Sequence, residues 1–282
     1  MIRRYLRALG QNLALYVGVA VVALYSLTPF VWAISTSLKH EDELFGRARL
    51  IPQDPTLDHY VAVLSNGPFL RALANSFLVA GGSAVLALAA GSFAAYALGR
   101  LRFRGKTTML YVVLAMTMFP QISVLSGMYE NVREFGIFGT QFAMLYAYPL
   151  FTLPFAAWVL TSFFRGLPRE IEEAAVVDGA TTAQIFVRIL LPLTTPALVT
   201  TGLLTFIVSW NEYVFALAFT LTSPGAQTVP VAIAQFTGIV SRQEPIAEIM
   251  AGAIIVTVPL VVLVLLFQRR IAAGLTAGSV KG

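Results

Sequence analysis

Long stretches without Asp, Glu, Lys or Arg dominate the chain. Five are uncharged throughout and a sixth holds one acid, Glu212; they cover 8–38, 72–99, 107–129, 135–164, 249–268 and 189–241. An α-helix rises 1.5 Å per residue, so about 20 residues cross the roughly 30 Å of bilayer hydrocarbon. The pattern predicts transmembrane helices near 12–34, 72–99, 107–129, 139–164, 193–221 and 247–267.

The predicted fold class is therefore an all-α integral membrane protein with six transmembrane helices. The first span has the basic start of a signal peptide, but it far exceeds the 7–15 apolar residues of one, so we expect a retained anchor. Pro120, Pro149 and Pro154 are expected to kink the third and fourth helices, for gating or simply for curvature. In the second helix, Gly81-Gly82 and Gly91 are expected to allow close packing.

The distribution of Lys and Arg between alternate loops predicts the orientation. Thirteen of the nineteen fall on one side, at 3–7, 100–106, 165–188 and 269–281, and six fall on the other. Cytoplasmic loops carry the excess of positive charge, so the richer side is expected to be cytoplasmic. An even number of spans then places both termini in the cytoplasm.

The segment 165–192 between the fourth and fifth spans is predicted to form two short amphipathic helices. Pro168 suits the first helical position, and Gly179 is expected to end the first helix as a C-terminal cap. Thr181 or Thr182 can cap the start of the second helix, and Pro192 limits its end. Physical reasoning leaves two interpretations open, an elbow that fits a groove on another protein or a helix that rests on lipid.

The spacing within this segment resembles a known motif. Glu173-Ala174-Ala175, three residues, Gly179, nine residues, Ile189, one residue and Leu191-Pro192 resemble the EAA loop of ABC-importer permeases. That resemblance implies the type I ABC importer permease fold and a coupling helix that sits in a cleft of a cytoplasmic ATPase subunit. The residues that it assigns to ATPase coupling are Glu173, Ala174, Ala175, Asp178, Gly179, Ile189 and Pro192.

The C-terminal residues carry a second resemblance. The run 274–282 is similar to the tail of the smaller permease subunit of maltose-type sugar importers, and 235–238, 244–245 and 268–271 look most like actinobacterial trehalose-importer permeases. In that family the tail reaches between two ATPase subunits. The resemblance therefore implies ATPase contacts within a cytoplasmic tail, 268–282, at Gly274, Leu275, Thr276, Gly278, Lys281 and Gly282.

Polar residues inside the spans are candidates for the route of a sugar, because sugars need amides, hydroxyls and aromatic rings together. The candidates are Asn75, Asn211, Glu212 and Tyr213, with Ser76 of similar chemistry. Ordinary interhelical hydrogen bonds use the same groups. For Glu212, near the outer end of its helix, a structural role and a place on the sugar route both stay open.

Composition agrees with a membrane protein and excludes several other classes. The chain is 57% hydrophobic and 12% charged, whereas soluble proteins carry about 25% charged residues. Its net charge of +5 lies in short runs between apolar stretches, which suits anionic lipid better than nucleic acid. There is no cysteine, and His40 and His59 without further ligands predict no metal site.

The motif Gly105-Lys106-Thr107 is an incomplete phosphate-binding loop, because position 100 is Arg100 where that loop needs glycine. We therefore expect no catalysis and no cofactor on this chain, with ATP and Mg²⁺ bound by ATPase subunits.

Together these observations predict one transmembrane permease domain, 1–282, in the cytoplasmic membrane of a bacterium. The resemblance implies an ABC importer of a disaccharide such as trehalose or maltose. The implied partners are a second permease, two ATPase subunits and an extracytoplasmic sugar-binding protein, for which the outer loop 222–246 is the candidate contact. The competing hypothesis is a secondary transporter driven by an ion gradient, which predicts ionisable residues deep in the bundle and an inverted repeat.

Overall fold

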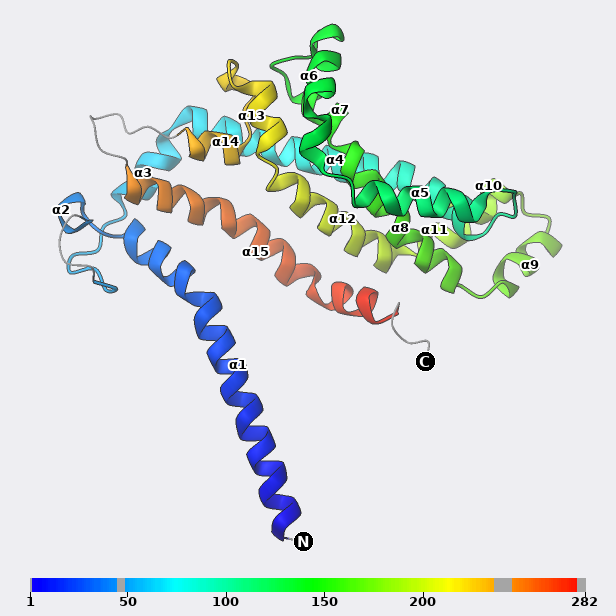
Figure 1. Ribbon diagram of the computed structural model, residues 1–282, viewed down its shortest axis with the longest axis horizontal. Helices are drawn as coiled ribbons and strands as arrows, with labels where there is room; N and C mark the ends of the chain where they lie inside the picture. The colour runs from blue at the N-terminus through cyan, green and yellow to red at the C-terminus, as the bar shows by residue number, and fades with distance from the viewer. Residues whose placement is uncertain (1, 45–48, 236–244, 278–282) are drawn as a thin grey trace. The chain divides into compact units, whose positions relative to one another are not determined.

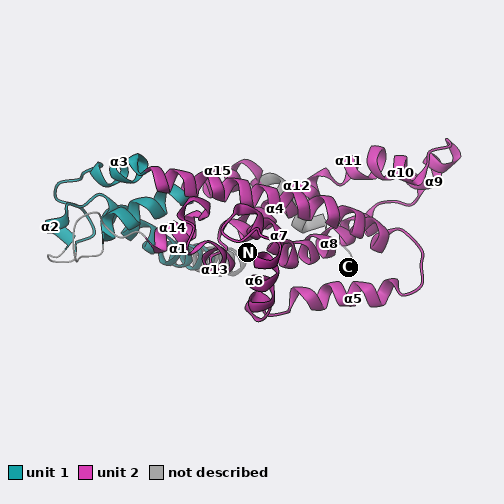
Figure 2. Cartoon of the chain, turned by 90° about the horizontal axis from the view of Figure 1, so that it is seen from above, with its two compact units in different colours: residues 1–66, 236–257 teal, residues 67–235, 258–282 magenta. Residues whose placement is uncertain are grey.

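The computed structural model describes residues 2–44, 49–235 and 245–277, and every regular element in that part of the chain is helical. Two compact units divide the chain, 1–66 with 236–257 and 67–235 with 258–282 (Figure 2). The prediction of a single permease domain stays a prediction.

The first unit contains α1 (Ile2–Ser37), α2 (Glu41–Leu44), α3 (Asp58–Ser65) and the start of α15 (Ile246–Ala277). Helix α1 begins ten residues before the predicted 12–34, and its residues 15–32 are exposed, whereas Ser35, Thr36 and Ser37 at its end are buried. Polar contacts fold the segment that follows it. The Ser37 and Tyr60 hydroxyls lie 2.7 Å apart, and the Lys39 ammonium donates to the Arg49 carbonyl over 2.6 Å.

The second unit is a bundle of helices and short helical turns. Its elements are α4 (Gly67–Gly99), α5 (Lys106–Thr117), η1 (Gln121–Val124), α6 (Leu125–Glu134), α7 (Gln141–Ala147), α8 (Pro149–Gly166), α9 (Glu170–Val177), α10 (Thr182–Gln184), η2 (Ile185–Leu190), α11 (Leu191–Leu193), α12 (Thr195–Trp210), α13 (Val214–Thr220), η3 (Pro224–Ala226), α14 (Val229–Ala234) and the rest of α15.

Helix α4 runs along α8 and α12 (Figure 1), and glycines let it approach α7 and α8 closely. A Cβ on Gly91 would lie 3.1 Å from the Ala156 Cβ, and one on Gly82 would lie 2.7 Å from a Leu145 methyl. The expectation of close packing is confirmed at these two glycines. Among the described residues it is wrong at Gly81, where an added Cβ would meet no atom within 4 Å.

Two of the predicted spans, the third and the fourth, are bent, and a further bend lies at the start of the predicted fifth span. The axis turns by 96° between Lys106–Thr117 and Gln121–Glu134, by 43° between Gln141–Ala147 and Pro149–Gly166, and by 74° between Thr182–Leu193 and Thr195–Trp210. The first two bends lie at Pro120 and Pro149, as predicted, because proline lacks the N–H that a continuous helix needs. Pro154 lies inside α8 without a break.

The predicted fifth span, 193–221, is wrong in its continuity, because it divides into α12 and α13 at residues 211–213. The predicted sixth, 247–267, extends through Ala277, so the first ten residues of the predicted tail are helical. Among the described residues three helices are long and apolar enough to cross a membrane, and the number reaches six if each bent pair is one span.

Two clusters of buried side chains form the interior of the second unit. The first surrounds Tyr148, Phe151 and Phe215, where α7, α8 and α13 meet. The second surrounds Tyr96, Phe164 and Phe186 and joins α4, α8 and the turns that follow α9. The second cluster includes side chains of the segment 165–192, which carries the resemblance to the EAA loop, and packs them against α4 and α8.

Candidate functional site

Helix α9 projects at the end of the second unit where α4 and α8 finish (Figure 1). Its first turn holds Glu170, Glu172 and Glu173, and carboxylates at a helix N-terminus are favoured by the helix dipole. The helix begins at Glu170, so Pro168 lies before it and not at its first position as predicted. The chain is extended at Leu167, the conformation that a residue before proline prefers.

Gly179 ends α9 as the sequence predicted. Its φ of 79° is left-handed, a conformation that glycine adopts without strain. The Ala180 N–H donates to the Ala175 carbonyl over 2.9 Å, and the Gly179 N–H donates to the Val176 carbonyl over 3.0 Å. These two bonds form a Schellman cap, which turns the chain sharply after one short helix.

The segment 165–192 folds as an elbow with two limbs, α9 and the helical run that follows it. The N-cap of this second limb is Thr181, which resolves the choice between Thr181 and Thr182. The Gln184 N–H donates to the Thr181 hydroxyl, and the Thr181 N–H donates to the Gln184 side chain, so both halves of a capping box are present. The run continues through a widened turn, η2, to Leu193. Pro192 therefore lies inside the helical run, two residues before the 74° bend, and does not end it as predicted.

The two limbs differ in exposure. In the second limb Ile185, Phe186 and Leu190 are buried, and the Phe186 ring lies 5.0 Å from that of Tyr96. Ile189 is half-buried against the same cluster. In α9 only Ala175 is buried, and Glu173, Ala174, Asp178 and Gly179 are exposed, with Val176 and Val177 at 61% and 87%. The second limb is thus an anchor, and α9 offers a free acidic and apolar face.

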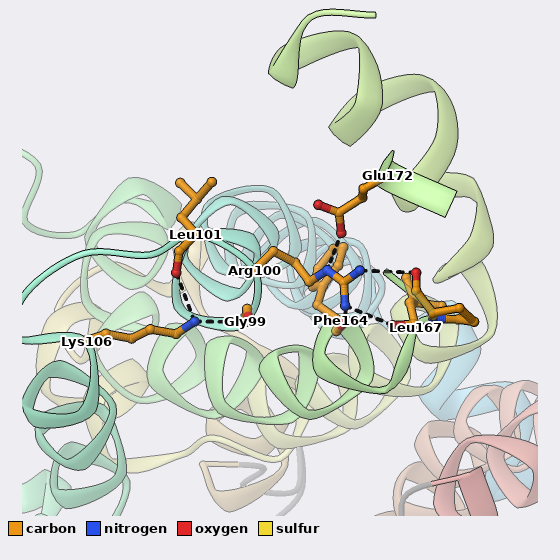
Figure 3. Close-up of polar contacts among 8 residues, drawn as sticks. Gly99, Arg100, Leu101, Lys106, Phe164, Leu167 and Glu172 are labelled. Carbon is orange, nitrogen blue, oxygen red and sulfur yellow. Dashed lines mark hydrogen bonds and ion pairs between the residues drawn. The ribbon is translucent and has the colours of Figure 1, made fainter. Parts of the chain in front are cut away.

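Arg100 connects this elbow to the bundle, a role that the sequence did not predict. Its side chain is 4% exposed and pairs with the Glu172 carboxylate. It also donates to the carbonyls of Phe164, Leu167 and Pro168 over 3.2, 2.8 and 3.2 Å (Figure 3). An arginine directly after a long apolar helix, with glutamates in the next loop on the same side, is a signal that could have identified this contact.

Lys106 lies beside Arg100 and binds the end of α4. Its ammonium donates to the carbonyls of Gly99 and Leu101 over 3.1 and 2.9 Å (Figure 3). A cation is stabilised by the negative end of a helix dipole, so this lysine serves as a C-terminal cap of α4. A groove of about 370 Å³ lies nearby, lined by Arg100, Arg169, Glu172, Glu173 and Val176.

The predicted route residues take part in structural contacts. The Asn75 amide donates to the carbonyls of Gly225 and Gln227 over 3.0 and 2.9 Å and accepts from Gln141 over 2.9 Å. The Asn211 amide donates to the Ile207 carbonyl, one turn earlier in α12. The Ser76 hydroxyl accepts from the Val229 N–H over 2.8 Å. The bonds of Asn75 and Ser76 hold α4 against the segment 225–229.

Glu212 lies at the break between α12 and α13. Its carboxylate accepts from the N–H groups of Phe215 and Ala216 over 2.8 and 3.0 Å and from the Tyr148 hydroxyl over 2.7 Å. It therefore caps α13 and ties it to the start of α8, which favours the structural interpretation of this acid. Tyr213 is 38% exposed beside it.

Two adjoining cavities, which the sequence did not predict, lie at the Pro120 bend. They have volumes of about 280 and 170 Å³ and share Met116, Phe119, Gln121 and Phe151 as lining residues. The second is also lined by Thr205, whose buried hydroxyl has no hydrogen-bond partner among the described residues. Aromatic rings beside an amide and hydroxyls are the chemistry expected on a sugar route.

The predicted tail contacts are only partly within the described residues. Gly274, Leu275 and Thr276 lie in the last turns of α15. Gly278, Lys281 and Gly282 lie outside the described part of the chain, as do residues 236–244, which carried part of the resemblance to trehalose permeases. The ATPase-contact assignments therefore stay predictions.

Comparison with known proteins adds the following findings. The family described as "Binding-protein-dependent transport system inner membrane component" matches residues 70–277. The trehalose transport system permease protein SugB of Mycobacterium tuberculosis is 42% identical over 97% of this chain and 100% of its own length. The trehalose/maltose transport system permease protein MalG of Thermococcus litoralis is 40% identical over 96% and 98%.

Similarity to a solved structure supports the same fold. A chain of a bacterial ABC transporter involved in the import of the acidic polysaccharide alginate matches with a TM-score of 0.76 and 24% identity. The match covers 92% of this chain and 95% of that one. The helix arrangement described above is therefore that of an ABC importer permease.

Proposed function

Because the chain belongs to the inner-membrane components of binding-protein-dependent transport systems, we propose that it is the permease subunit of an ATP-driven importer of a disaccharide such as trehalose or maltose. The nearly full-length relationship to two trehalose permeases, each at 40% identity or more, is the observation that carries the choice of substrate. The sugar-binding partner and the membrane location follow the family, whose members depend on an extracytoplasmic binding protein.

The coupling site is α9 with its Schellman cap. A short helix with Glu173, Val176 and Val177 exposed, fixed to the bundle by a buried second limb, suits insertion into a cleft of an ATPase subunit. ATP binding and hydrolysis take place on two such subunits, which this chain itself does not supply. Their closure moves α9 as a lever, and the bundle changes between inward-open and outward-open states.

The remaining partners are assigned by topology. Both termini and α9 face the cytoplasm, because the Lys and Arg excess lies on their side. The sugar-binding protein contacts the opposite side at 222–246, of which η3 and α14 are described. A second permease completes the route, which passes the cavities at the Pro120 bend.

The coupling assignment is tested with Gly179→Asp in the complex reconstituted in liposomes. We expect sugar uptake and the ATPase activity stimulated by sugar-loaded binding protein to fall at least tenfold, because a charged side chain is added at a left-handed position beside the docking helix. Gly105→Asp is the matched control, since Gly105 has a φ of 83° and, as at Gly179, an added Cβ would meet no atom of the described residues within 4 Å. Full uptake by the Gly179→Asp complex would show that this loop is not the coupling site.

The same preparation distinguishes the competing hypothesis. An importer driven by ATP retains an ATPase subunit on affinity purification and keeps transporting when a protonophore removes the proton gradient. A secondary transporter would purify without the ATPase and would lose uptake with the gradient. Binding of the extracytoplasmic partner to a panel of sugars identifies the substrate.

A further inference from the structure

The contact between Arg100 and Glu172 joins three helices at one point. Arg100 is the first residue after α4, Glu172 lies in the first turn of α9, and the carbonyls of Phe164 and Leu167 lie in the last turn of α8 and directly after it (Figure 3). Only three residues, 167–169, connect α8 with α9 along the chain, and Leu167 is extended. A short helix on such a linker would pivot if nothing else held it.

The chemistry of this contact makes it rigid. A guanidinium carries five N–H donors in a planar fork and keeps its charge at every physiological pH. Here the fork is 4% exposed and divides its donors between a carboxylate and three backbone carbonyls. The carbonyls at the end of α8 carry the negative end of the helix dipole, so the cation is stabilised from two directions.

Glu172 and Glu173 are adjacent but have different surroundings. Successive residues of a helix point about 100° apart. Glu172 therefore turns toward Arg100 with 23% of its side chain exposed, while Glu173 stays on the exposed face of α9. Glu173 is therefore available for a partner, and Glu172 attaches α9 to the bundle.

We propose that the Arg100–Glu172 pair is a positioning brace that transmits the movement of α9 to α4 and α8. The inference rests on the proposed coupling role of α9 and extends it to residues outside the EAA motif. With the brace intact, a force on α9 displaces the ends of both long helices. Without it, α9 turns about residues 167–169 and the ATPase cycle no longer moves the bundle.

The test compares Glu172→Gln and Arg100→Lys in the reconstituted complex. The first variant removes the charge with little change of shape, and the second keeps the charge but loses the planar fork. We expect both complexes to assemble and to keep wild-type basal ATPase activity, with a lower midpoint of thermal unfolding because hydrogen bonds to a buried charged group are lost. Sugar transported per ATP hydrolysed should fall about tenfold, the size expected when hydrogen bonds to a charged group are lost.

Arg102→Lys and Glu134→Gln are the matched controls, because they make the same substitutions at exposed positions. A transport-to-ATP ratio within twofold of wild type in both brace variants would overturn the inference. So would loss of the ATPase subunits from both variant complexes, since the pair would then be needed for assembly and not for transmission. If Gly179→Asp abolishes coupling while the brace variants do not, the coupling site stands and only the brace fails.

Discussion

Single polar side chains that are partly buried hold the helices of the second unit together. Asn75 and Glu212 each satisfy several partners at once, and in a membrane protein such groups must find those partners within the chain. Arg100 does the same at the other end of α4. Of the polar residues predicted from sequence as candidates for substrate contact, Glu212 caps α13 and Asn75 ties α4 to Gly225 and Gln227.

The carboxylate of Glu212 provides a direct test at this scale. Glu212→Gln leaves one amide oxygen where two carboxylate oxygens now accept three hydrogen bonds, so α13 loses part of its cap. We expect a loss of about 1–2 kcal/mol of stability, measured as a lower midpoint of thermal unfolding in detergent.

The sugar concentration for half-maximal uptake should stay unchanged in the same variant. Glu134→Gln, an exposed acid at the end of α6, serves as the control for charge removal. A shifted uptake constant with an unchanged unfolding midpoint would place Glu212 on the sugar route instead.

Among the elements, the pairing of α4 with α8 determines where the coupling elbow sits. Gly91 and Gly99 allow close contact, since an added Cβ would lie 3.1 Å from Ala156 Cβ and 3.0 Å from Phe164 Cβ. Arg100 and Phe164 then meet at the ends of the two helices. Small residues at such contacts let helix backbones approach each other in lipid.

A pair of valine substitutions separates this packing from a general effect of helix glycines. Gly91→Val inserts a branched side chain against the Ala156 and Ala157 backbone and should cost about 1–3 kcal/mol through overpacking. Gly81→Val faces open space and should be neutral or slightly stabilising, because valine is a better helix former than glycine. Thermal unfolding of the purified protein measures both, and equal losses would argue against the close contact at Gly91.

For the whole molecule, the distribution of charge sets the orientation on which every partner assignment depends. The absence of cysteine makes that orientation easy to measure with single introduced thiols. We expect Arg104→Cys, in the basic loop after α4, to react with a membrane-impermeant maleimide only after the cells are permeabilised.

Glu134→Cys, at the end of α6, should react in intact cells, and both positions are exposed in the structure. The reverse pattern of labelling would invert the topology and move α9 to the outer side. The proposed contact with a cytoplasmic ATPase would then be impossible.

The sequence determined the helical class, the places of the apolar spans and the elbow at 168–192. Charge-free length and the spacing from Glu173 to Pro192 depend only on neighbours along the chain, and so do the cap at Gly179 and the choice of Thr181 or Thr182 for the next cap, which the structure settles at Thr181. The bends at Pro120 and Pro149 follow equally from the local loss of an N–H donor.

Tertiary structure alone decided the rest. The break at 211–213 is stabilised by Tyr148, which lies 64 residues away, and the role of Arg100 depends on carbonyls up to 68 residues away. The difference between Gly81 and Gly91 likewise depends on which face of α4 meets α8. Such contacts arise from the packing of distant helices, and hydropathy and motif spacing carry no information about which side chains that packing brings together.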